Sequence, residues 1–368
     1  MKIIVIPDSF KGTLTAIEVC DIISRGLIER NPSAEIKAIP MADGGEGTCE
    51  AFRYALGGEM IPCRVHGPFM GMQDSYYWRR GDVAVIELAA AAGFIADAMK
   101  QNPSVTTTYG VGELIRHAIG GGCRKIILGL GGSCTNDAGL GIAAALGAKF
   151  LDEDNRAFLP TGNTIVDIQQ MDLTELLETI RGIEFEVMCD VDNPLYGKQG
   201  AAYVFAPQKG ADETMVRELD HNLQAFAKLI QENLALDVSG VPGSGAAGGA
   251  GAGALAFLNA QLKPGAQIVL EMNEFDTLLK SADLVITGEG QLDEQSLRGK
   301  VVVTVAQAAK AAHVPVIAVV GNTQDVITPV YQYGVKKVIR TIDYCHDPAH
   351  YAASCRQDLY RAVEEIRL

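Results

Sequence analysis

The chain has 368 residues, of which 48% are hydrophobic and 21% are charged. This length exceeds what one hydrophobic core usually holds, so we expect two domains. The formal net charge of −14 argues against nucleic acid as a partner, because a nucleic-acid-binding surface needs a concentrated basic face.

The sequence carries no sign of a membrane segment or a secretion signal. Its apolar runs stay well below the roughly 20 residues that a spanning helix needs, and the N-terminus opens directly on a strand. The eight cysteines form no C-x-x-C pair and stand beside no histidine at zinc-ligand spacing. We therefore expect a cytoplasmic protein with reduced thiols.

The N-terminal stretch predicts strand, helix, strand and helix in turn. Lys2–Pro7 is an apolar run without alternation, which is typical of a strand covered on both faces. The sequence Thr15-Ala-Ile-Glu18 has the form of a capping box and predicts where the next helix begins. A short strand over 35–39 and a helix over 49–56 follow.

The rest of the chain also alternates strands with helices. The middle predicts strands over 83–88, 125–130 and 184–189 and helices over 109–119, 136–146, 212–232 and 246–259. The C-terminal part predicts strands over 283–287, 315–320 and 336–341 and helices over 301–312, 326–333 and 349–366.

This order of elements predicts an α/β protein of two domains. Residues 1–61 and 262–368 should together form a discontinuous, flavodoxin-like domain with a parallel sheet. Residues 62–261 should form a second α/β domain that is inserted into the first. We expect the active site in the cleft between the two domains.

Loops rich in acids and glycines follow five of the predicted strands. In open α/β sheets, ligands bind outside the carboxyl ends of the strands. Carboxylates beside flexible glycines suit Mg²⁺ and phosphate groups together, although an Asx turn or a helix cap explains any single acid equally well. Five such loops favour a site for a nucleotide and a metal. The candidate residues are Asp8, Ser9, Lys11, Asp43, Glu46, Gly131, Gly132, Ser133, Asn136, Asp137, Asp190, Asp192, Asn193, Gly288, Glu289 and Asp293.

Two of these loops point to an anion. Lys11 precedes a helix, where the helix dipole disfavours a cation unless a bound anion compensates it; a surface lysine is the plain alternative. Lys300 and Arg298 invite the same argument more weakly. The stretch GLGGSCTNDAG at 129–139 joins a strand to a helix through glycines and hydroxyl residues, which can present backbone N–H groups to phosphate. It resembles the GLGSS loop of small-molecule kinases, but the P-loop pattern does not occur.

A second glycine-rich loop matches a dinucleotide-binding pattern. Gly243-Ser-Gly-Ala-Ala-Gly248 satisfies G-x-G-x-x-G, and Ile268-Val-Leu-Glu271 follows as a predicted strand that ends in an acid. The Val-Pro that precedes Gly243 spoils the buried strand that must feed the first glycine, and a bare match is weak in a chain with 40 glycines. Close helix packing is the better explanation of this loop.

Six motifs together carry a family resemblance. PDSFKGTLTA, ADGGEGT, GLGGSCTNDAG, CDVDNPLYG, PGSGAAGGAGAGA and TGEGQLDEQSLRGK occur in this order between Pro7 and Lys300. In this set the chain resembles the bacterial glycerate kinases of the first class, with Cys134 as a mild variation where small residues are usual. The resemblance implies a flavodoxin-like domain with an inserted α/β domain. It also implies ATP-dependent phosphorylation of D-glycerate with Mg²⁺, usually at the 2-hydroxyl, giving 2-phospho-D-glycerate.

Direct phosphoryl transfer fits this activity, because such a reaction depends on positioning and charge neutralisation. Asp190 or Asp192 would accept the hydroxyl proton, and Lys11 would meet phosphate oxygens or the glycerate carboxylate. Glu289 and Asp293 would coordinate Mg²⁺. The remaining residues expected to contact the cofactor are Gly131, Gly132, Ser133, Asn136, Asp137 and Gly288. Those expected to contact the substrate are Asp8, Ser9, Asp43, Glu46 and Asn193. Asp8 could instead hold Lys11 or reach the metal, and Asp43 and Glu46 could form a second metal position.

Two other classes of function stay open from the sequence. An NAD-dependent hydroxyacid dehydrogenase could use the loop from Gly243 to Gly248, and a metabolite-binding protein without activity could keep the same cleft. Whether the chain forms a homodimer is also left open.

Overall fold

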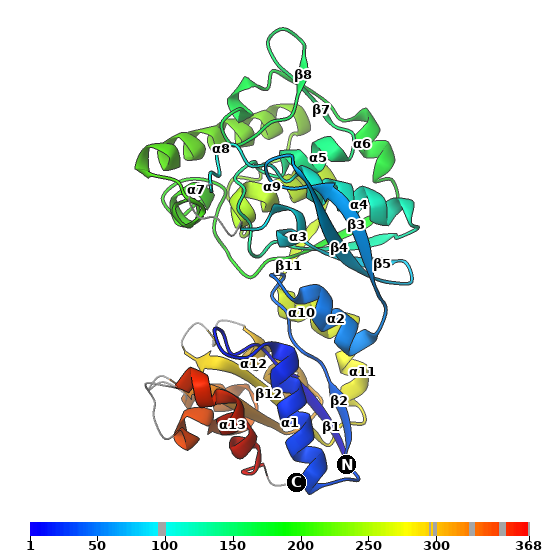
Figure 1. Ribbon diagram of the computed structural model, residues 1–368, viewed down its shortest axis with the longest axis vertical. Coiled ribbons are helices and arrows are strands. Elements are labelled where there is room, and N and C mark those ends of the chain that lie inside the picture. Colours follow the sequence, from blue (N-terminus) through cyan, green and yellow to red (C-terminus); the bar gives the residue numbers. More distant parts are fainter. Residues whose placement is uncertain (95–100, 294–295, 297–299, 324–327, 346–350, 367–368) are drawn as a thin grey trace. The chain divides into compact units, whose positions relative to one another are not determined.

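The computed structural model describes residues 1–94, 101–293, 296, 300–323, 328–345 and 351–366. These residues form two compact units (Figure 1). The terminal unit comprises Met1–Ala42, Glu50–Gly57 and Ala266–Leu368, and the central unit comprises Asp43–Cys49 and Gly58–Gly265. The domain boundaries predicted after residues 61 and 261 stay a prediction.

The terminal unit is built on a five-stranded sheet in the order β14-β13-β12-β1-β2, and every neighbouring pair is parallel. In chain order the sheet therefore reads 2-1-3-4-5, which is the flavodoxin-like arrangement, and its switch point lies between β1 and β12. The predicted flavodoxin-like parallel sheet is confirmed. The strands are β1 (Lys2–Pro7), β2 (Glu35–Ala38), β12 (Leu284–Leu292), β13 (Val316–Thr323) and β14 (Val335–Arg340).

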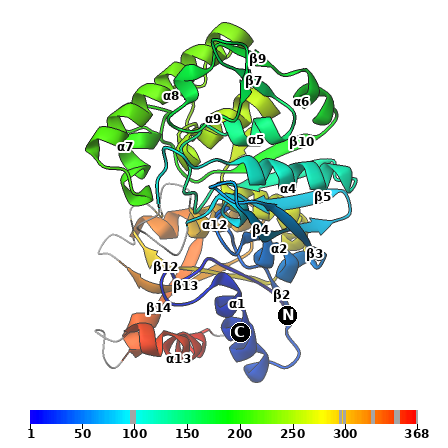
Figure 2. The ribbon, with the colours of Figure 1, turned by 45° about the horizontal axis from the view of Figure 1, so that its top comes forward.

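Helices from both chain ends cover this sheet. α1 (Ala16–Arg30) and α13 (Tyr351–Val363) lie side by side and share one hydrophobic cluster with the strands (Figures 1 and 2). The other helices of this part of the chain are α2 (Thr48–Leu56), α10 (Gly265–Met272), α11 (Phe275–Leu279), α12 (Val301–Ala311) and the 3₁₀ helices η5 (Thr328–Tyr333) and η6 (Thr341–Tyr344). The helix expected over 326–333 is thus a 3₁₀ helix over its described part.

The predicted capping box begins α1. The backbone N–H of Glu18 donates to Oγ1 of Thr15 at 3.2 Å, and the N–H of Thr15 donates back to Oε2 of Glu18 at 2.9 Å. Two N–H groups at the helix start that would otherwise lack a partner are satisfied in this way. The apolar side of the helix, including Val19, Ile23 and Leu27, is fully buried against the sheet.

The central unit has a six-stranded mixed sheet in the order β11-β10-β6-β5-β4-β3. The four strands from β11 to β5 are parallel, and β4 pairs antiparallel with both β5 and β3. The strands are β3 (Glu59–His66), β4 (Met72–Arg80), β5 (Val83–Glu87), β6 (Lys125–Gly129), β10 (Glu184–Met188) and β11 (Gln261–Lys263). The β3–β4 hairpin and the strand β11 were absent from the sequence-based prediction.

Helices and a small antiparallel sheet complete the central unit (Figure 2). α4 packs on β3 and β5, and α9 packs on β10 and β11. The helices are α3 (Ala89–Ala92), α4 (Tyr109–Gly120), α5 (Leu140–Ala145), α6 (Thr174–Thr179), α7 (Ala201–Phe205), α8 (Glu213–Leu234), α9 (Ala246–Leu258), η2 (Ile165–Asp167) and η3 (Pro207–Lys209), and the small sheet holds β7 (Lys149–Leu151), β8 (Ala157–Phe158) and β9 (Gln170–Asp172).

The helix predicted over 136–146 begins only at Leu140. Ala138 and Gly139 have positive φ values of 53° and 72°, so they cannot belong to a right-handed helix. The prediction was wrong for 136–139, because helical periodicity in the sequence does not reveal the left-handed backbone conformation of the residues that precede Leu140. None of the helices in the described ranges combines the length and the hydrophobicity that crossing a membrane requires.

Candidate active site

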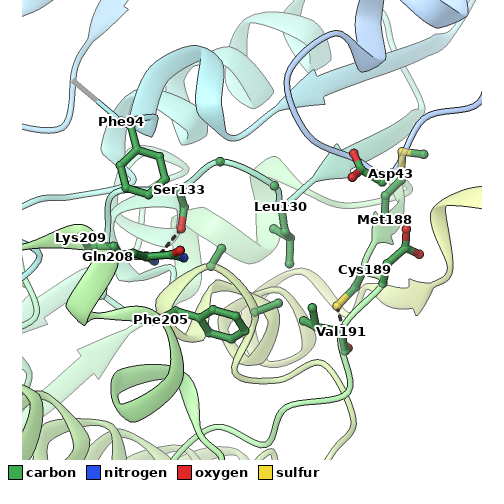
Figure 3. Close-up of a pocket in the computed structure, with 15 residues that line it drawn as sticks. Asp43, Phe94, Leu130, Ser133, Met188, Cys189, Val191, Phe205, Gln208 and Lys209 are labelled. Carbon is green, nitrogen blue, oxygen red and sulfur yellow. Dashed lines mark hydrogen bonds between the residues drawn. The ribbon is translucent and has the colours of Figure 1, made fainter. Parts of the chain in front are cut away.

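The central unit has a cavity of about 200 Å³ beside the loops that follow β6 and β10 (Figure 3). Because β5, β6 and β10 are parallel, their carboxyl ends meet at one edge of the sheet, where ligands of α/β proteins usually bind. The lining residues are Asp43, Phe94, Leu130, Gly131, Gly132, Ser133, Met188, Cys189, Asp190, Val191, Phe205, Gln208, Lys209, Ala246 and Ala247. Five of the predicted site residues, Asp43, Gly131, Gly132, Ser133 and Asp190, are thus brought together.

Glycines hold two of these loops in direct backbone contact. The N–H of Gly131 donates to the carbonyl of Gly44 at 3.0 Å. A Cβ added to Gly131 would lie 2.5 Å from Cα of Gly45, and one added to Gly129 would lie 2.3 Å from the carbonyl oxygen of Gly44. No side chain fits between backbones this close, so the glycines of the GLGG and DGGEG motifs bring the loop that carries Asp43 onto the carboxyl end of β6.

Lys209 extends into the same cavity from η3. Its side chain is buried, with 2% of its surface exposed, and Nζ donates to Oγ of Ser133 at 2.7 Å (Figure 3). Nζ also donates to the carbonyl of Thr135 at 2.7 Å. Desolvation by burial lowers the pKa of Lys209 to about 8, against the smaller opposing effects of Cys134 and Asp137. Within the described ranges, no carboxylate forms an ion pair with this ammonium group.

Asp137 fixes the loop that carries Ser133. The fully buried carboxylate accepts from the backbone N–H of Thr108 at 2.7 Å and from its hydroxyl at 2.9 Å, and also from the N–H groups of Gly139 and Gly141. Burial raises the pKa of Asp137, and these hydrogen bonds oppose the rise. Both carboxylate oxygens thus accept hydrogen bonds from within the protein. Asp137 would therefore act on a cofactor through the loop that it holds in place.

The residues between Ser133 and Asp137 have unsatisfied polar groups. Oγ1 of Thr135 and both polar atoms of the Asn136 side chain are buried and find no hydrogen-bond partner among the described residues. Buried polar groups of this kind usually bind ordered water or a ligand. The prediction that Asn136 contacts a cofactor is untested, but its amide is available for such a contact.

The acids after β10 differ in their positions. Asp190 lines the cavity, and its Oδ1 accepts from the N–H of Gly265 at 2.8 Å, which orients the carboxylate. Asp192 is exposed, and Nδ2 of Asn193 donates to the carbonyl of Gln199 at 2.8 Å. Neither Asp192 nor Asn193 belongs to the cavity lining in the described part of the chain. Asp190 is therefore the better placed of the two candidate bases.

The loop from Asp43 to Gly47 places one acid at the cavity and one away from it. Oδ1 of Asp43 accepts from the N–H of Gly45 at 3.0 Å, which is an Asx turn. The residue is exposed and lies at the opposite end of the cavity from Lys209 (Figure 3). Glu46 is exposed and is not among the described lining residues.

In the terminal unit, three acids gather at the switch point of the sheet. The N–H of Asp8, directly after β1, donates to the carbonyl of Gly288 in β12 at 2.8 Å. Glu289 follows Gly288, and 6% of its surface is exposed. The pKa of Glu289 is raised to about 7, mainly by burial. A hydrogen bond from Ser296 and the charge of Lys300 oppose this rise, and the charges of Asp8 and Asp293 add to it. Oε1 of Glu289 is buried without a hydrogen-bond partner among the described residues.

These acids fit a metal by their chemistry, although they do not form a complete metal site. Carboxylate oxygens are the ligands that Mg²⁺ prefers, and the unsatisfied oxygen of Glu289 is suited to such a role. Oδ1 of Asp293 accepts from the N–H of Ser296 at 3.1 Å. In the part of the chain that the structure describes, no three His, Cys, Asp or Glu side chains converge as metal ligands. Mg²⁺ usually takes its remaining ligands from water and substrate phosphates.

The loop before α1 brings Lys11 to the same strand end. Ser9 donates its N–H to Oδ1 of Asp8 at 2.6 Å, and Lys11 is exposed in the turn that follows. A Cβ added to Gly290 would lie 3.1 Å from the backbone nitrogen of Lys11, so this turn rests on β12. Gly288 itself is buried against the carbonyl of Val319, where a side chain would not fit. Arg298 lies outside the described residues.

The dinucleotide-binding alternative lacks its structural context. No strand leads into Gly243, since residues 235–245 contain only turns and irregular backbone, and all of them are described. Ala247, Gly248 and Gly249 all have positive φ values, of 53°, 68° and 87°, at the start of α9. A Cβ on Gly248 would lie 2.1 Å from the carbonyl of Thr135. The strand predicted over 268–271 was wrong, since these residues lie in the helix α10. The glycines of this loop serve close packing, as the sequence indicated.

Lys209 is the site residue that sequence reasoning missed. In the sequence it stands between Pro207-Gln208 and Gly210, which reads as an exposed turn, and lysine is rarely buried. Gly210 ends η3 with φ 96°, so the proline and the glycine set the turn that directs Lys209 inward. No periodicity marks this direction, because it depends on a contact with Ser133 across 76 residues of chain.

Comparison with known proteins agrees with this description. The model of the glycerate kinase family matches residues 3–368. A glycerate kinase of Bacillus cereus is 45% identical over 92% of this chain and 90% of its own length, and the glycerate 2-kinase of Escherichia coli K12 is 43% identical over 93% and 91%. A crystal structure from Salmonella typhimurium LT2, provisionally described as glycerate kinase 2, superposes with a TM-score of 0.86 at 39% identity, over 99% of this chain and 96% of that one. The chain belongs to the glycerate kinase family, whose members are kinases that phosphorylate an alcohol group.

Proposed function

We propose that this chain transfers the γ-phosphoryl group of ATP to the 2-hydroxyl of D-glycerate in the presence of Mg²⁺, giving 2-phospho-D-glycerate. The observation that carries the proposal is the cavity of the central unit, where Asp190 and the glycine-rich loop after β6 line one small space. A carboxylate can accept the proton of the attacking hydroxyl, and the N–H groups of such a loop suit phosphate oxygens. The likeness to a glycerate 2-kinase supports the position of attack.

In this proposal the residues of the central unit bind and orient the substrate. Asp190, held by the N–H of Gly265, takes the hydroxyl proton, with Asp192 as the second candidate. Gly131, Gly132 and Ser133 lie along phosphate oxygens. The substrate would also contact Asp43, Glu46 and Asn193. The cofactor would also contact Asn136, and Asp137 would act on the cofactor through the loop that it holds.

The terminal unit supplies groups suited to a metal and a nucleotide. Glu289 and Asp293 would hold Mg²⁺, with Asp8 beside them and with Gly288 and Ser9 shaping the loops. When bound, Mg²⁺ neutralises phosphate charge and orients the transferred group. Lys11 adds a cation at the same strand end. That one active site takes residues from both units stays a prediction, and variants in each unit test it.

We also propose a cytoplasmic location, which the eight cysteines support because all are thiols in the structure. A homodimer stays an open question that analytical ultracentrifugation would answer.

Phosphorus NMR of the reaction mixture tests the proposed function. The wild-type protein, D-glycerate, ATP and Mg²⁺ should give ADP and one new phosphomonoester resonance that coincides with added 2-phospho-D-glycerate. Samples with L-glycerate, without glycerate, or with excess chelator serve as controls. A resonance that coincides with 3-phosphoglycerate would refute the regiochemistry, and formation of no phosphoglycerate at all would leave a protein that only binds its ligands.

A further inference from the structure

The cavity of the central unit has a buried cation without an anionic partner. Lys209 keeps 2% of its surface exposed, and its two hydrogen bonds among the described residues go to a hydroxyl and a carbonyl, which are both neutral acceptors. An ammonium group has three donors, so the bonds to Ser133 and Thr135 leave one for the cavity that Lys209 lines. Desolvation of an unpaired charge is costly, and proteins rarely retain one unless it acts on a ligand.

The charged groups around Lys209 do not replace such a ligand. The charge of the buried Asp137 acts on Lys209, but the oxygens of that carboxylate accept hydrogen bonds from Thr108 and from backbone N–H groups. Burial raises the pKa of the Cys134 thiol to about 11, so this neighbour is neutral near pH 7. The remaining titratable groups of the cavity lining are Asp43, Cys189 and Asp190, and none forms an ion pair with Lys209 among the described residues.

We propose that Lys209, held by Ser133 and Thr135, is the oxyanion receptor of this cavity and pairs with a carboxylate or phosphate oxygen of the bound substrate. The proposal deepens the proposed function and rests on it for the identity of the substrate. A cavity of about 200 Å³ lies below the roughly 300–1,000 Å³ typical of sites for larger ligands, and therefore suits a three-carbon acid better than a whole nucleotide. The glycerate carboxylate is accordingly the expected partner, which gives the Ser133 side chain to the substrate and leaves the backbone N–H groups of the loop for phosphate.

Ser133 then has a positioning role that sequence reasoning did not give it. Because its hydroxyl accepts from Nζ at 2.7 Å, its own proton can point to the same oxyanion as the lysine. The two side chains come from different elements, the loop after β6 and η3, so the receptor forms only when the central unit is folded.

Direct binding tests the proposal apart from catalysis. Isothermal titration of the full-length protein with D-glycerate, and separately with ATP and Mg²⁺, would compare wild type with Lys209→Met and Lys209→Arg. Removing the charge should weaken the binding of the oxyanion ligand by about 100-fold, while arginine keeps the charge and should lose less. A loss with glycerate alone identifies the carboxylate as the partner, and a loss with ATP alone identifies a phosphate. Equal affinities of wild type and Lys209→Met for both ligands would overturn the proposal.

The pH dependence of binding to wild type gives a second readout that needs no variant. The oxyanion binds the protonated amine, so affinity should be constant below pH 8 and fall about tenfold per pH unit above it. The carboxylate of glycerate is ionised throughout this range, and Lys209→Arg should remove the break near pH 8. An affinity without this break in wild type would also overturn the proposal. Failure of the proposed function looks different, since wild type would then bind glycerate but form no phosphoglycerate.

Discussion

Glu289 offers a direct test of how the terminal unit tolerates a buried acid. Its pKa is raised to about 7 from the ordinary value of 4.5, mainly because burial disfavours the charged form. A native carboxyl that keeps its proton longer than the unfolded one stabilises the fold at low pH, and this contribution is lost as pH rises through 7. The change Glu289→Gln removes the ionisation while keeping the shape of the side chain.

The expected size of the effect follows from the difference between the two pKa values. A rise from 4.5 to about 7 corresponds to about 3 kcal/mol between full protonation and full ionisation. The glutamine variant should therefore gain about 2–3 kcal/mol on wild type between pH 5 and pH 8.5. Urea unfolding in metal-free buffer measures this, with far-UV circular dichroism reporting the whole chain and the single tryptophan, Trp78, reporting the central unit.

Glu364→Gln is the matched control, because Glu364 is an exposed acid of the same unit. That variant should follow wild type within about 0.5 kcal/mol at both pH values. If Glu289→Gln differs from wild type by the same amount at pH 5 and at pH 8.5, the carboxyl does not titrate near 7, and the argument from burial is wrong.

Three further predictions address the central unit and the first helix. Asp190→Asn should lower kcat by about 10²–10⁴ while the KM for ATP changes little, as a coupled ADP assay would show; if only Asp192→Asn has this effect, the base is Asp192. Gly131→Ala should destabilise the central unit by about 1–3 kcal/mol and reduce activity, because the added Cβ would clash with backbone. Gly240→Ala is the control, because open space surrounds Gly240, and it should change neither stability nor activity. Urea unfolding and rate assays measure both variants. Thr15→Ala should cost about 1 kcal/mol in thermal unfolding, and no change would discount the capping box.

The sequence was sufficient to predict the parallel core of the fold. Apolar runs open both central strands, Ile3–Ile6 in β1 and Leu284–Ile286 in β12, because helices cover both faces of the sheet, and such runs are visible without any partner. The β3–β4 hairpin was missed for the opposite reason. β4 alternates buried with exposed residues only in part and carries Asp74 and two arginines, so its strand character depends on pairing with β3 and β5.

For the candidate site, the sequence predicted which loops matter better than what each side chain does. Gly131, Ser133 and Asp190 line one cavity, because the carboxyl ends of parallel strands must meet at one edge. The role of Asp137 could not be read, since its hydrogen bonds reach Thr108 on another segment. Lys209 was invisible for the same reason, as its burial depends on a partner far away in the chain.

The two units show opposite departures from ordinary packing at corresponding places in their sheets. At the carboxyl ends of the central strands, the buried Lys209 has only neutral partners, while at the switch point of the terminal sheet a buried Glu289 keeps one oxygen unsatisfied. Neither feature improves stability once the group is charged, because a buried charge without a partner of opposite sign is unfavourable. Ligands of opposite charge would relieve both: an acid at the lysine and a cation at the glutamate. A kinase that phosphorylates an organic acid with a magnesium–nucleotide complex handles that pair of ligands, so the electrostatics of each unit, taken by itself, argue for the same reaction.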